Sequence, residues 1–353
     1  MKEKVLLGMS GGVDSSVSAI LLQEQGYEVV GATMRLWEGK EEICGSSSNV
    51  NDAKIVCKKL GIEHHVLDLK EEFKTCVIND FINAYKNAKT PNPCIECNKH
   101  LKFGYFYKKA QELGCKYIAT GHYAKTEYSE KYNQVVLKKS NSSKKDQSYV
   151  LYNIPRNMIE NVLFPLADFE NKEQIRHIAE EHGLTVASKP DSQEICFIPD
   201  NNYGKFLEEN LEYKPKAGNI VDENGRVLGK HRGLIYYTIG QRKGLGISSP
   251  TPLYVIKLDK IKNEVVVGKE EKIYSKELFA DSINFTVFDK LEKELKVKAK
   301  VRYLANEANA TIYPCDENTL RVEFEEPQRA ITPGQSVVFY DDDILIGGGK
   351  IIR

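Results

Sequence analysis

Three cysteines lie in polar segments, where a thiol is placed to react rather than to pack. Cys94 and Cys97 form a Cys-x-x-Cys pair within Thr90-Pro-Asn-Pro-Cys-Ile-Glu-Cys-Asn98, and the prolines predict a stiff loop. Cys196 lies in a second polar loop, Lys189-Pro-Asp-Ser-Gln-Glu-Ile-Cys-Phe-Ile198, which ends in a short apolar strand. A thiol that carries sulfur as a persulfide needs a second thiol to break the sulfur–sulfur bond. Such chemistry therefore requires the fold to bring the two loops together.

The same cysteines admit other interpretations. A Cys-x-x-Cys pair is often half of a zinc site, but zinc takes four ligands and the sequence has no second pair of this spacing. Three cysteines can hold an iron–sulfur cluster that leaves one iron position open. Cys196 taken alone is also compatible with an ordinary buried thiol. From the residues, sulfur exchange and a cluster both remain open.

A second reactive pattern, Ser10-Gly-Gly-Val-Asp-Ser-Ser16, stands between the first apolar run and the first helical pattern. Its glycines allow a sharp turn in which backbone N–H groups face an anion, and the following helix N-terminus adds partial positive charge. Asp14 suits an anion site only if a cation such as Mg²⁺ bridges it to phosphate. The pattern is neither the P-loop nor the dinucleotide fingerprint. The structural alternative is a tight turn in which Asp14 and Ser15 start a helix.

The segments that must position these residues alternate between strand and helix patterns in the first half of the chain. This alternation predicts a parallel sheet flanked by helices, with ligands at the carboxyl ends of the strands. The predicted strands are 4–9, 28–34, 64–69 and 116–120, and the predicted helices are 15–25, 50–60, 70–88 and 101–113.

The second half is rich in short strands after one short helix at 202–210. Asp222-Glu-Asn-Gly225 is a hairpin turn signal, and regularly spaced strands predict a small barrel or sandwich. The predicted strands are 253–258, 264–267, 296–303, 310–313, 320–325 and 336–340. We therefore expect three domains: a catalytic domain over 1–200, a central domain over 201–275 and a C-terminal barrel or sandwich over 276–353.

Charge is balanced over the 353 residues, with 50 Lys+Arg against 50 Asp+Glu, which excludes a chain that binds polyanions by bulk charge. Two stretches without acids could still form a basic face. Residues 131–145 hold five lysines, and residues 224–258 hold six basic residues together with Tyr236 and Tyr237. Such tyrosines would offer stacking faces to RNA bases. Ordinary solvated surface is the alternative interpretation.

Hydrophobic runs are short throughout the sequence. The apolar run before Gly11 is too short for a signal sequence, and no later run approaches the roughly twenty residues of a membrane span. We expect a cytoplasmic protein whose eight cysteines are mostly reduced.

Taken together, these segments resemble the tRNA-specific 2-thiouridylases (tRNA-uridine 2-sulfurtransferases), a family of the ATP pyrophosphatase superfamily. The phosphate loop is common to that superfamily, whereas the cysteine segments and residues 237–246 are specific to the family. The resemblance extends from residue 8 to residue 349. It rests on Gly8-Met-Ser-Gly-Gly-Val-Asp-Ser15, Thr90-Pro-Asn-Pro-Cys-Ile-Glu-Cys97, Gly121-His-Tyr-Ala124, Lys145-Asp-Gln-Ser-Tyr149, Asp191-Ser-Gln-Glu-Ile-Cys-Phe197, Tyr237-Thr-Ile-Gly-Gln-Arg-Lys-Gly-Leu-Gly246 and Thr332-Pro-Gly-Gln-Ser336.

The resemblance implies an α/β fold with three parts. These are an N-terminal parallel-sheet ATP-pyrophosphatase domain (adenine nucleotide alpha hydrolase-like), a small central β-rich domain that binds tRNA, and a C-terminal β-barrel. It also implies ATP-dependent 2-thiolation of the wobble uridine, position 34 of tRNA. ATP, with Mg²⁺, would adenylate O2 of the base, and a persulfide would then deliver sulfur with release of AMP.

The resemblance further assigns roles to individual residues. Cys97 would be the nucleophile, and Cys196 would carry the persulfide and form a transient disulfide with Cys97. The implied ATP contacts are Gly8, Met9, Ser10, Gly11, Gly12, Val13, Asp14, Ser15, Met34 and Gly121. The target base would lie against Asn92, Pro93 and Cys94. The implied tRNA contacts are His122, Lys145, Asp146, Gln147, Arg302, Tyr303 and Gln335.

Partners and departures complete what the resemblance implies. The expected partners are tRNAs for Glu, Gln and Lys and a cysteine desulfurase or sulfur-relay protein that supplies the persulfide. Some members have Asp where this sequence has Cys94, so the role of Cys94 stays open. A [4Fe-4S] cluster on Cys94, Cys97 and Cys196 remains the alternative sulfur carrier. Asp341-Asp-Asp343 also departs from the family pattern, and we expect this change to be structural drift.

Overall fold

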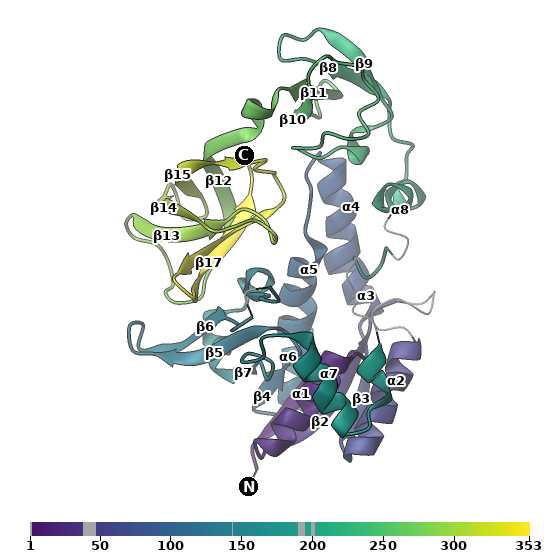
Figure 1. The fold of residues 1–353 in the computed structure, drawn as a ribbon, viewed down its shortest axis with the longest axis vertical. Coiled ribbons are helices and arrows are strands. Elements are labelled where there is room, and N and C mark those ends of the chain that lie inside the picture. The colour runs from purple at the N-terminus through teal and green to yellow at the C-terminus, as the bar shows by residue number, and fades with distance from the viewer. Residues whose placement is uncertain (1, 38–46, 143, 190–194, 199–201) are drawn as a thin grey trace.

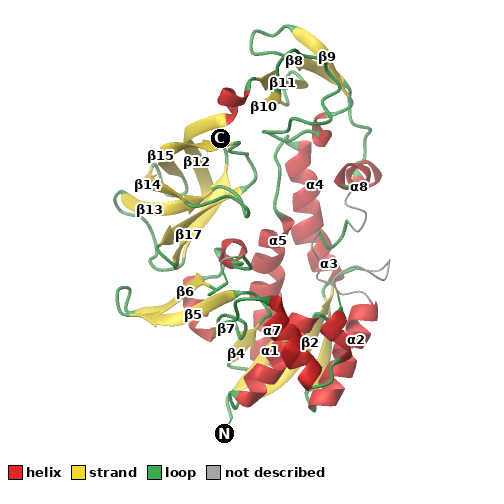
Figure 2. Ribbon diagram, viewed as in Figure 1, coloured by secondary structure: helices red, strands yellow, loops and turns green. Residues whose placement is uncertain are grey.

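The computed structural model describes residues 2–37, 47–142, 144–189, 195–198 and 202–353. The N-terminal α/β region and the central β sheet lie at opposite ends of the molecule, and the C-terminal barrel lies to one side between them (Figure 1). Helices gather in the N-terminal region, whereas the central and C-terminal regions are built mainly of strands (Figure 2). No helix in these described ranges is long and apolar enough to cross a membrane.

The N-terminal region is built on a five-stranded parallel sheet of order β3-β2-β1-β4-β7. Its strands are β1 (Lys4–Gly8), β2 (Glu28–Arg35), β3 (Glu63–Asp68), β4 (Tyr117–Ala119) and β7 (Val162–Leu163). The parallel sheet was predicted from the alternating patterns, and β7 was not. The chain runs from β1 outward on one side and returns to β4 on the other. The loop after β1 therefore opens at a topological switch point, where such sheets bind ligands.

Helices cover both faces of this sheet because residues of β1 alternate in direction. Val5 and Leu7 pack into a core formed with α1 (Val13–Glu24), α2 (Ser47–Leu60) and α7 (Lys172–Glu181). Leu6 points the other way, into a core that includes Phe106 of α6 (Phe106–Glu112). All three β1 residues are fully buried, which fixes the start of the phosphate loop.

The helical run that carries Cys94 and Cys97 begins earlier than the sequence predicted. It consists of α5 (Pro93–Glu96), a π-helical segment Cys97–Tyr105 and then α6. The prediction that these cysteines lie on a loop was therefore wrong. Pro93 occupies the first helical position, where its missing N–H has no helical partner to lose, and the Asn92 side chain accepts a hydrogen bond from the Cys94 N–H at 3.2 Å.

A second helical run crosses between the sheet and the central region. It consists of α3 (Lys70–Phe73), a π-helical segment Lys74–Ile78 and α4 (Asn79–Lys86), close to the predicted helix over 70–88. The central region follows α8 (Tyr203–Asn210) and is a four-stranded sheet of order β10-β11-β8-β9. Its strands are β8 (Gly218–Val221), β9 (Val227–His231), β10 (Tyr254–Asp259) and β11 (Glu264–Gly268).

The C-terminal region is a closed antiparallel barrel of order β12-β15-β14-β13-β16-β17, in which β12 and β17 pair to complete the ring. Its strands are β12 (Tyr274–Phe285), β13 (Leu295–Lys300), β14 (Ala308–Pro314), β15 (Leu320–Arg329), β16 (Ser336–Asp341) and β17 (Ile344–Ile351). A hairpin of β5 (Ala124–Ser129) and β6 (Gln134–Lys139) from the N-terminal region joins this sheet where Lys138 pairs with Ile344. The sequence analysis did not predict this hairpin.

Two apolar cores join the regions into one body. Val338, Tyr340 and Leu345 of the barrel pack in the same core as Leu151 and Tyr152 of the N-terminal region. The second core combines the central sheet with the helical run 70–86. Its members include Val255, Val265, Phe73, Phe81 and Phe197.

Candidate active site

The phosphate loop is held in shape by hydrogen bonds among its own residues. Ser15 Oγ donates to the Gly12 carbonyl at 3.0 Å, and the Ser10 N–H donates to Ser15 Oγ at 3.2 Å. Gly11 has a φ of 72°, and a Cβ there would lie 2.4 Å from the Asn49 carbonyl oxygen. The backbone can take this turn only because the position is glycine. The N-cap residue of α1 is Gly12, which has no side chain that could block an anion.

Asp14 faces two groups that the sequence analysis did not single out. The Tyr123 hydroxyl donates to Asp14 Oδ1 at 3.0 Å, and Lys172 Nζ lies 2.6 Å from Asp14 Oδ2. Lys172 is the first residue of α7, and its ammonium stands at the mouth of the phosphate loop. Tyr123 lies inside the segment Gly121-His-Tyr-Ala124, so the sequence analysis had included its segment. For Lys172 the sequence offered only its position directly after Asn171.

Lys189 is a second lysine at this loop. Its ammonium donates to the Gly11 carbonyl at 3.2 Å, to Asn49 Oδ1 at 2.8 Å and to Asp52 Oδ2 at 2.7 Å. Lys189 begins the segment that leads to Cys196, so it ties the phosphate loop to the second cysteine segment. Residues 190–194 of that segment lie outside the described residues.

The other predicted nucleotide contacts lie around the same edge of the sheet. A Cβ on Gly121 would lie 3.1 Å from the Ser15 nitrogen, so Gly121 allows the chain after β4 to approach the loop closely. Met9 is fixed to β2, since its N–H donates to the Ala32 carbonyl at 2.8 Å. Met34, near the end of β2, is half-buried and borders two cores. Their role in nucleotide binding stays a prediction.

The two thiols that the sequence places on separate segments belong to the same apolar cluster. Cys97, 8% exposed, is part of the core that also contains Phe197 and Leu101, and the partly buried Cys196 packs against it. The predicted strand at Cys196 is absent. Residues 195–198 form a turn in which the Ile198 N–H donates to the Ile195 carbonyl at 2.8 Å. The side chains of Phe197 and Ile198 are buried in this turn and not along a sheet edge.

Cys94 is exposed on α5, three residues before the buried Cys97. Burial raises the pKa of Tyr303, with smaller contributions from Asp146 and Cys94. Within the described part of the chain, no three His, Cys, Asp or Glu side chains gather closely enough to hold a metal ion. The three cysteines therefore do not form a ready cluster site in this conformation.

Cys57 and Cys115 are ordinary buried thiols. Burial raises the pKa of Cys57 to about 12, and burial also raises the pKa of Cys115. Thiols of this kind stay protonated and react slowly at neutral pH.

His122 lies in a pocket of rings and cations beside the phosphate loop. Its Nδ1 is 2.8 Å from the Thr120 hydroxyl, its Nε2 is 3.4 Å from Lys102 Nζ, and its ring contacts Phe103 and Phe164. Burial, together with the Lys102 charge, holds the pKa of His122 well below its usual range. The imidazole is therefore neutral at pH 7 and acts as a hydrogen-bonding group rather than a cation.

The predicted tRNA segment Lys145-Asp-Gln147 is folded back on the chain beside His122. Gln147 Oε1 accepts a hydrogen bond from the Tyr123 N–H at 3.0 Å, so the segment connects through Tyr123 to Asp14. Asp146 accepts from the Ser140 N–H at 3.1 Å and from the Ser148 hydroxyl at 2.8 Å. Burial raises the pKa of Asp146, and its carboxylate shapes this loop.

The barrel contributes the remaining predicted tRNA residues. Tyr303 donates its hydroxyl to the Asp146 carbonyl at 3.2 Å, which brings the turn after β13 against the 145–147 loop. Arg302 lines a hollow of about 390 Å³ together with Tyr274 and Arg329. Gln335 does not point to open surface, since its side-chain amide donates to the Thr90 carbonyl at 2.9 Å and to the Pro91 carbonyl at 3.3 Å.

Comparison with known proteins covers the same three regions. Family models match residues 3–200 (tRNA methyl transferase HUP domain), 204–269 (tRNA methyl transferase PRC-barrel domain) and 275–351 (Aminomethyltransferase beta-barrel domain). The chain is 54% identical to the tRNA-specific 2-thiouridylase MnmA of Acetivibrio thermocellus over 99% of each chain. It is 51% identical to MnmA of Clostridioides difficile (strain 630), over 99% of this chain and 98% of that one. The chain belongs to the tRNA-specific 2-thiouridylase family.

Some solved structures match this 2-thiouridylase family member distantly. The U34-tRNA thiolase NcsA from Methanococcus maripaludis, with its [4Fe-4S] cluster, matches 59% of this chain and 67% of that one, at 17% identity and a TM-score of 0.35. A likeness this low carries no argument about the site.

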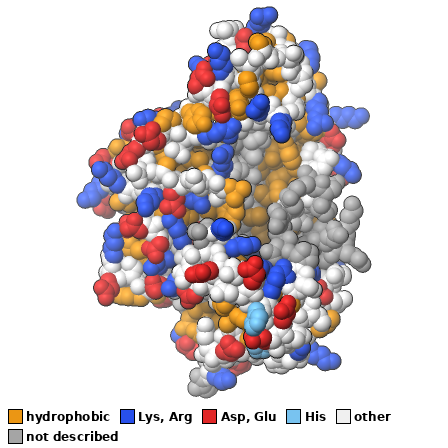
Figure 3. All heavy atoms as spheres, in the orientation of Figure 1, with side chains coloured by type: hydrophobic (Ala, Val, Ile, Leu, Met, Phe, Trp, Pro, Cys, Tyr) orange, Lys and Arg blue, Asp and Glu red, His pale blue; other side chains and the backbone are white. Residues whose placement is uncertain are grey.

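For a 2-thiouridylase, the basic stretch at 131–145 is less available to RNA than the sequence suggested. Barrel acids pair with three of its lysines: Lys131 with Asp341, Lys138 with Asp343, and Lys139 with Glu307. On the face shown in Figure 3, acidic and basic side chains are interspersed over this part of the molecule. Asp341 and Asp343, which we expected to be drift, join the hairpin to the barrel.

In the central domain of this 2-thiouridylase, the expected stacking tyrosines are buried. Tyr236 and Tyr237 are 9% and 5% exposed, so that prediction was wrong. The Tyr236 hydroxyl is bonded to Glu208 and its ring lies under Arg232, 3.9 Å from the guanidinium carbon to the ring centroid. These contacts use the ring faces within the domain.

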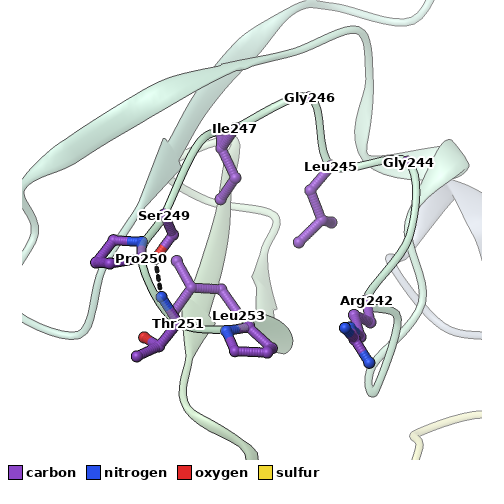
Figure 4. Close-up of a pocket in the computed structure, with 10 residues that line it drawn as sticks. Arg242, Gly244, Leu245, Gly246, Ile247, Ser249, Pro250, Thr251 and Leu253 are labelled. Atoms are coloured by element: carbon purple, nitrogen blue, oxygen red, sulfur yellow. Dashed lines mark hydrogen bonds between the residues drawn. The ribbon is translucent and has the colours of Figure 1, made fainter.

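A hollow of about 420 Å³ opens in the same domain, in the segment that is specific to the family. Arg242 stands on one side of it, and Leu245, Ile247 and Leu253 project from the surrounding loop (Figure 4). Gly244 and Gly246 have φ values of 77° and 67°, which let the loop turn around the hollow.

Proposed function

We propose that this protein thiolates the 2-position of the wobble uridine, U34, of tRNA in an ATP-dependent reaction. The observation that supports the proposal is that Cys97 and Cys196 belong to one apolar cluster, although 98 residues separate them in the sequence. The phosphate loop would supply the other half of the reaction, the binding of ATP. The uridine oxygen must be activated as a leaving group before sulfur can replace it.

The first step is adenylation of uridine O2. The oxygen attacks the α-phosphorus of ATP, the α–β bridging bond breaks and pyrophosphate leaves. The loop N–H groups, with Lys172 and Lys189, would bind the phosphate oxygens and stabilise the charge that develops on the leaving group. Asp14 is the residue that would hold Mg²⁺, which would neutralise further phosphate charge. The nucleotide would contact Gly8–Ser15, Met34 and Gly121.

The second step is transfer of sulfur from Cys196. The terminal sulfur of its persulfide attacks C2, and AMP leaves with the electrons of the C2–O bond. Cys97 thiolate then attacks Sγ of Cys196, which breaks the bond to the transferred sulfur and leaves a C2 thione. If Cys97 attacks first, hydrogen sulfide is released within the site and attacks C2. Either order ends in a Cys97–Cys196 disulfide, and an external dithiol must reduce it.

The remaining assignments follow the resemblance and belong to the same proposal. The target base would lie against Asn92, Pro93 and Cys94. tRNA would contact His122, Lys145, Asp146, Gln147, Arg302, Tyr303 and Gln335. The substrates would be tRNAs for Glu, Gln and Lys in the cytoplasm, and a cysteine desulfurase or relay protein would supply the persulfide. The domains would be 1–200 for catalysis, 201–275 for tRNA binding and 276–353 for the barrel.

A three-cysteine [4Fe-4S] cluster is the alternative sulfur carrier. We favour the persulfide because Cys97 and Cys196 are shielded within one apolar cluster, whereas Cys94 is exposed. Anaerobic purification with iron and sulfide analysis separates the two, since an iron-free protein with full activity has no need of the cluster.

The decisive experiment measures pyrophosphate release and 2-thiouridine formation with unmodified tRNA, ATP and a persulfide donor. We expect Cys97→Ser and Cys196→Ser to release pyrophosphate in a tRNA-dependent way but to form no 2-thiouridine. Cys315→Ser, at an exposed barrel thiol, is the matched control and should match wild type. The proposal fails if wild type releases no pyrophosphate with tRNA, or if both serine variants thiolate normally.

A further inference from the structure

One edge of the barrel holds the start of the segment that carries Cys97. The Thr90 N–H donates to the Pro333 carbonyl at 2.9 Å, and Gln335 donates to the carbonyls of Thr90 and Pro91. A Cβ on Gly334 would lie 2.9 Å from the Thr90 nitrogen, so the two backbones are in close contact. The turn 332–336 therefore fixes where α5 begins.

The same edge holds the end of α5. Lys350 Nζ on β17 lies 3.0 Å from Glu96 Oε1, and Glu96 directly precedes Cys97. Glu96 is buried, with only 9% of its surface exposed. Lys350 is also 3.7 Å from Asp80 of α4, and His100 Nε2 is 3.5 Å from Glu96 Oε2. The buried carboxylate thus has its closest cation on the barrel.

These two contacts belong to one rigid unit. Lys350 pairs with Ser336 in the barrel register, the Ile351 N–H donates to the Gln335 carbonyl at 2.8 Å, and the Gly334 N–H donates to the Ile351 carbonyl at 2.9 Å. Gln335 and Lys350 therefore move together. We call them, with residues 332–336 and 350–351, the barrel clamp.

We propose that the barrel clamp positions Cys97 for sulfur transfer, with Lys350 as the positioning residue that acts through Glu96. This inference rests on the proposed function and deepens it. The Lys350 ammonium already lies between two carboxylates, so it is engaged with the protein and not offered to RNA. Without that ammonium, Glu96 would have to leave its buried position or lose its charge, and either change would shift the start of the π-helical segment at Cys97.

The test compares Lys350→Met, Lys350→Arg and the double variant Lys350→Met/Glu96→Gln in the full-length protein. Single-turnover thiolation is measured at saturating tRNA and ATP, alongside the tRNA Kd and the thermal midpoint. We expect Lys350→Met to slow thiolation about tenfold, with the tRNA Kd changed less than about twofold. Lys350→Arg should restore most of the rate. The double variant, which removes both charges, should be no slower than Lys350→Met and should remain folded.

A second readout does not depend on the reaction. Alkylation of Cys97 by N-ethylmaleimide, followed by peptide mass spectrometry, should be at least about threefold faster in Lys350→Met than in wild type. The exposed Cys315 serves as internal reference. Lys276→Met is the matched lysine control, because Lys276 donates within the barrel, to the Glu325 carbonyl at 2.7 Å. It should leave thiolation and Cys97 alkylation unchanged.

Three outcomes overturn the inference: wild-type thiolation in Lys350→Met, a rate loss that higher tRNA concentration repairs, or an equal loss in Lys276→Met. If wild type itself forms no 2-thiouridine, the proposed function fails. In that case the alkylation rates of Cys97 still decide whether the barrel clamp holds its segment.

Discussion

At the scale of single residues, Gly11 shows how one missing side chain shapes the phosphate loop. We expect Gly11→Ala to lower the free energy of unfolding by more than about 2 kcal/mol, since it adds a clash with Asn49 to the backbone strain at a φ of 72°. ATP affinity should fall at least about tenfold, because the N–H groups would turn away from the anion. Urea unfolding and calorimetric titration measure the two effects.

Gly61 provides the control for this prediction. Its φ is 68°, but a Cβ there would meet nothing within 4 Å. Gly61→Ala should therefore cost only about 1 kcal/mol, from strain alone, and leave ATP affinity intact. Equal effects from the two substitutions would contradict the clash with Asn49.

His122 makes stability depend on pH. Its pKa is lowered in the folded protein, so below the unfolded pKa of about 6.5 the unfolded chain binds a proton that the folded chain does not. The free energy of unfolding should therefore fall as pH drops from 7.5 to 5.5, by up to about 1.4 kcal/mol per pH unit for one proton. The pKa of His64 is lowered by burial and contributes in the same direction.

Replacing His122 tests its share of this dependence. His122→Gln keeps a polar side chain but cannot titrate, so urea unfolding across this pH range should show a shallower decline. A slope identical to that of wild type would mean that His122 titrates normally.

At the scale of secondary-structure elements, the start of α7 presents Lys172 to Asp14. Asn171 accepts a hydrogen bond from the Gln174 N–H at 3.1 Å, and the Gln174 side chain accepts from the Asn171 N–H at 3.4 Å. Asn171→Ala should destabilise the protein by about 1 kcal/mol, because α7 loses its N-cap. It should also raise the KM for ATP several-fold, because the backbone of Lys172 would no longer be held in place beside Asp14. Steady-state kinetics at varied ATP measure this.

The N-cap of α8 is the matched control for that prediction. Asn202 accepts from the Lys205 N–H at 3.0 Å, far from the phosphate loop in the fold. Asn202→Ala should cost similar stability and leave the KM for ATP unchanged. A KM increase of the same size in both variants would refute a specific role for α7.

Elements also show where the sequence was sufficient. The apolar strand patterns predicted β1 to β4 as strands of a parallel sheet, because buried parallel strands and their helices have distinct periods. The start of α5 was missed because Pro93 both breaks helices and begins them, and only its cap bond with Asn92 decides between the two. The β5–β6 hairpin was missed because its lysines resembled solvated surface, and their barrel partners lie about 200 residues away.

At the scale of the whole molecule, the barrel and the N-terminal region should unfold together. A Cβ on Gly348 would lie 2.8 Å from the Tyr152 ring and 2.7 Å from the Val337 carbonyl. Gly348→Ala should therefore cost about 1 to 3 kcal/mol by overpacking the shared core. The single tryptophan, Trp37, lies in the N-terminal region and reports its unfolding by fluorescence.

This prediction has a clear contrary outcome. The Trp37 transition should shift together with the circular dichroism of the whole chain. If Gly348→Ala shifted only the dichroism and left the Trp37 midpoint in place, the two regions would unfold independently despite their shared core.

The site is assembled from segments that lie far apart in the sequence, and this limits what the sequence could predict. The motifs marked Cys97, Cys196 and the phosphate loop, but Lys172, Lys189 and Lys350 reach them from distant segments with no local pattern. The sequence also could not show which charges pair. In the structure, acids of β16 and of the turn that follows it form ion pairs with lysines of the hairpin.

The shared core also has a consequence for how the chain is made. Val338, Tyr340 and Leu345 complete a core whose other members, such as Leu151, are synthesised far earlier. Roughly 190 residues separate Leu151 from Val338, so a ribosome adding about 5 to 20 residues each second needs about 10 to 40 s to supply them. Throughout that interval the nascent first domain exposes an apolar face. We therefore expect a chaperone to bind the nascent chain most during this part of translation.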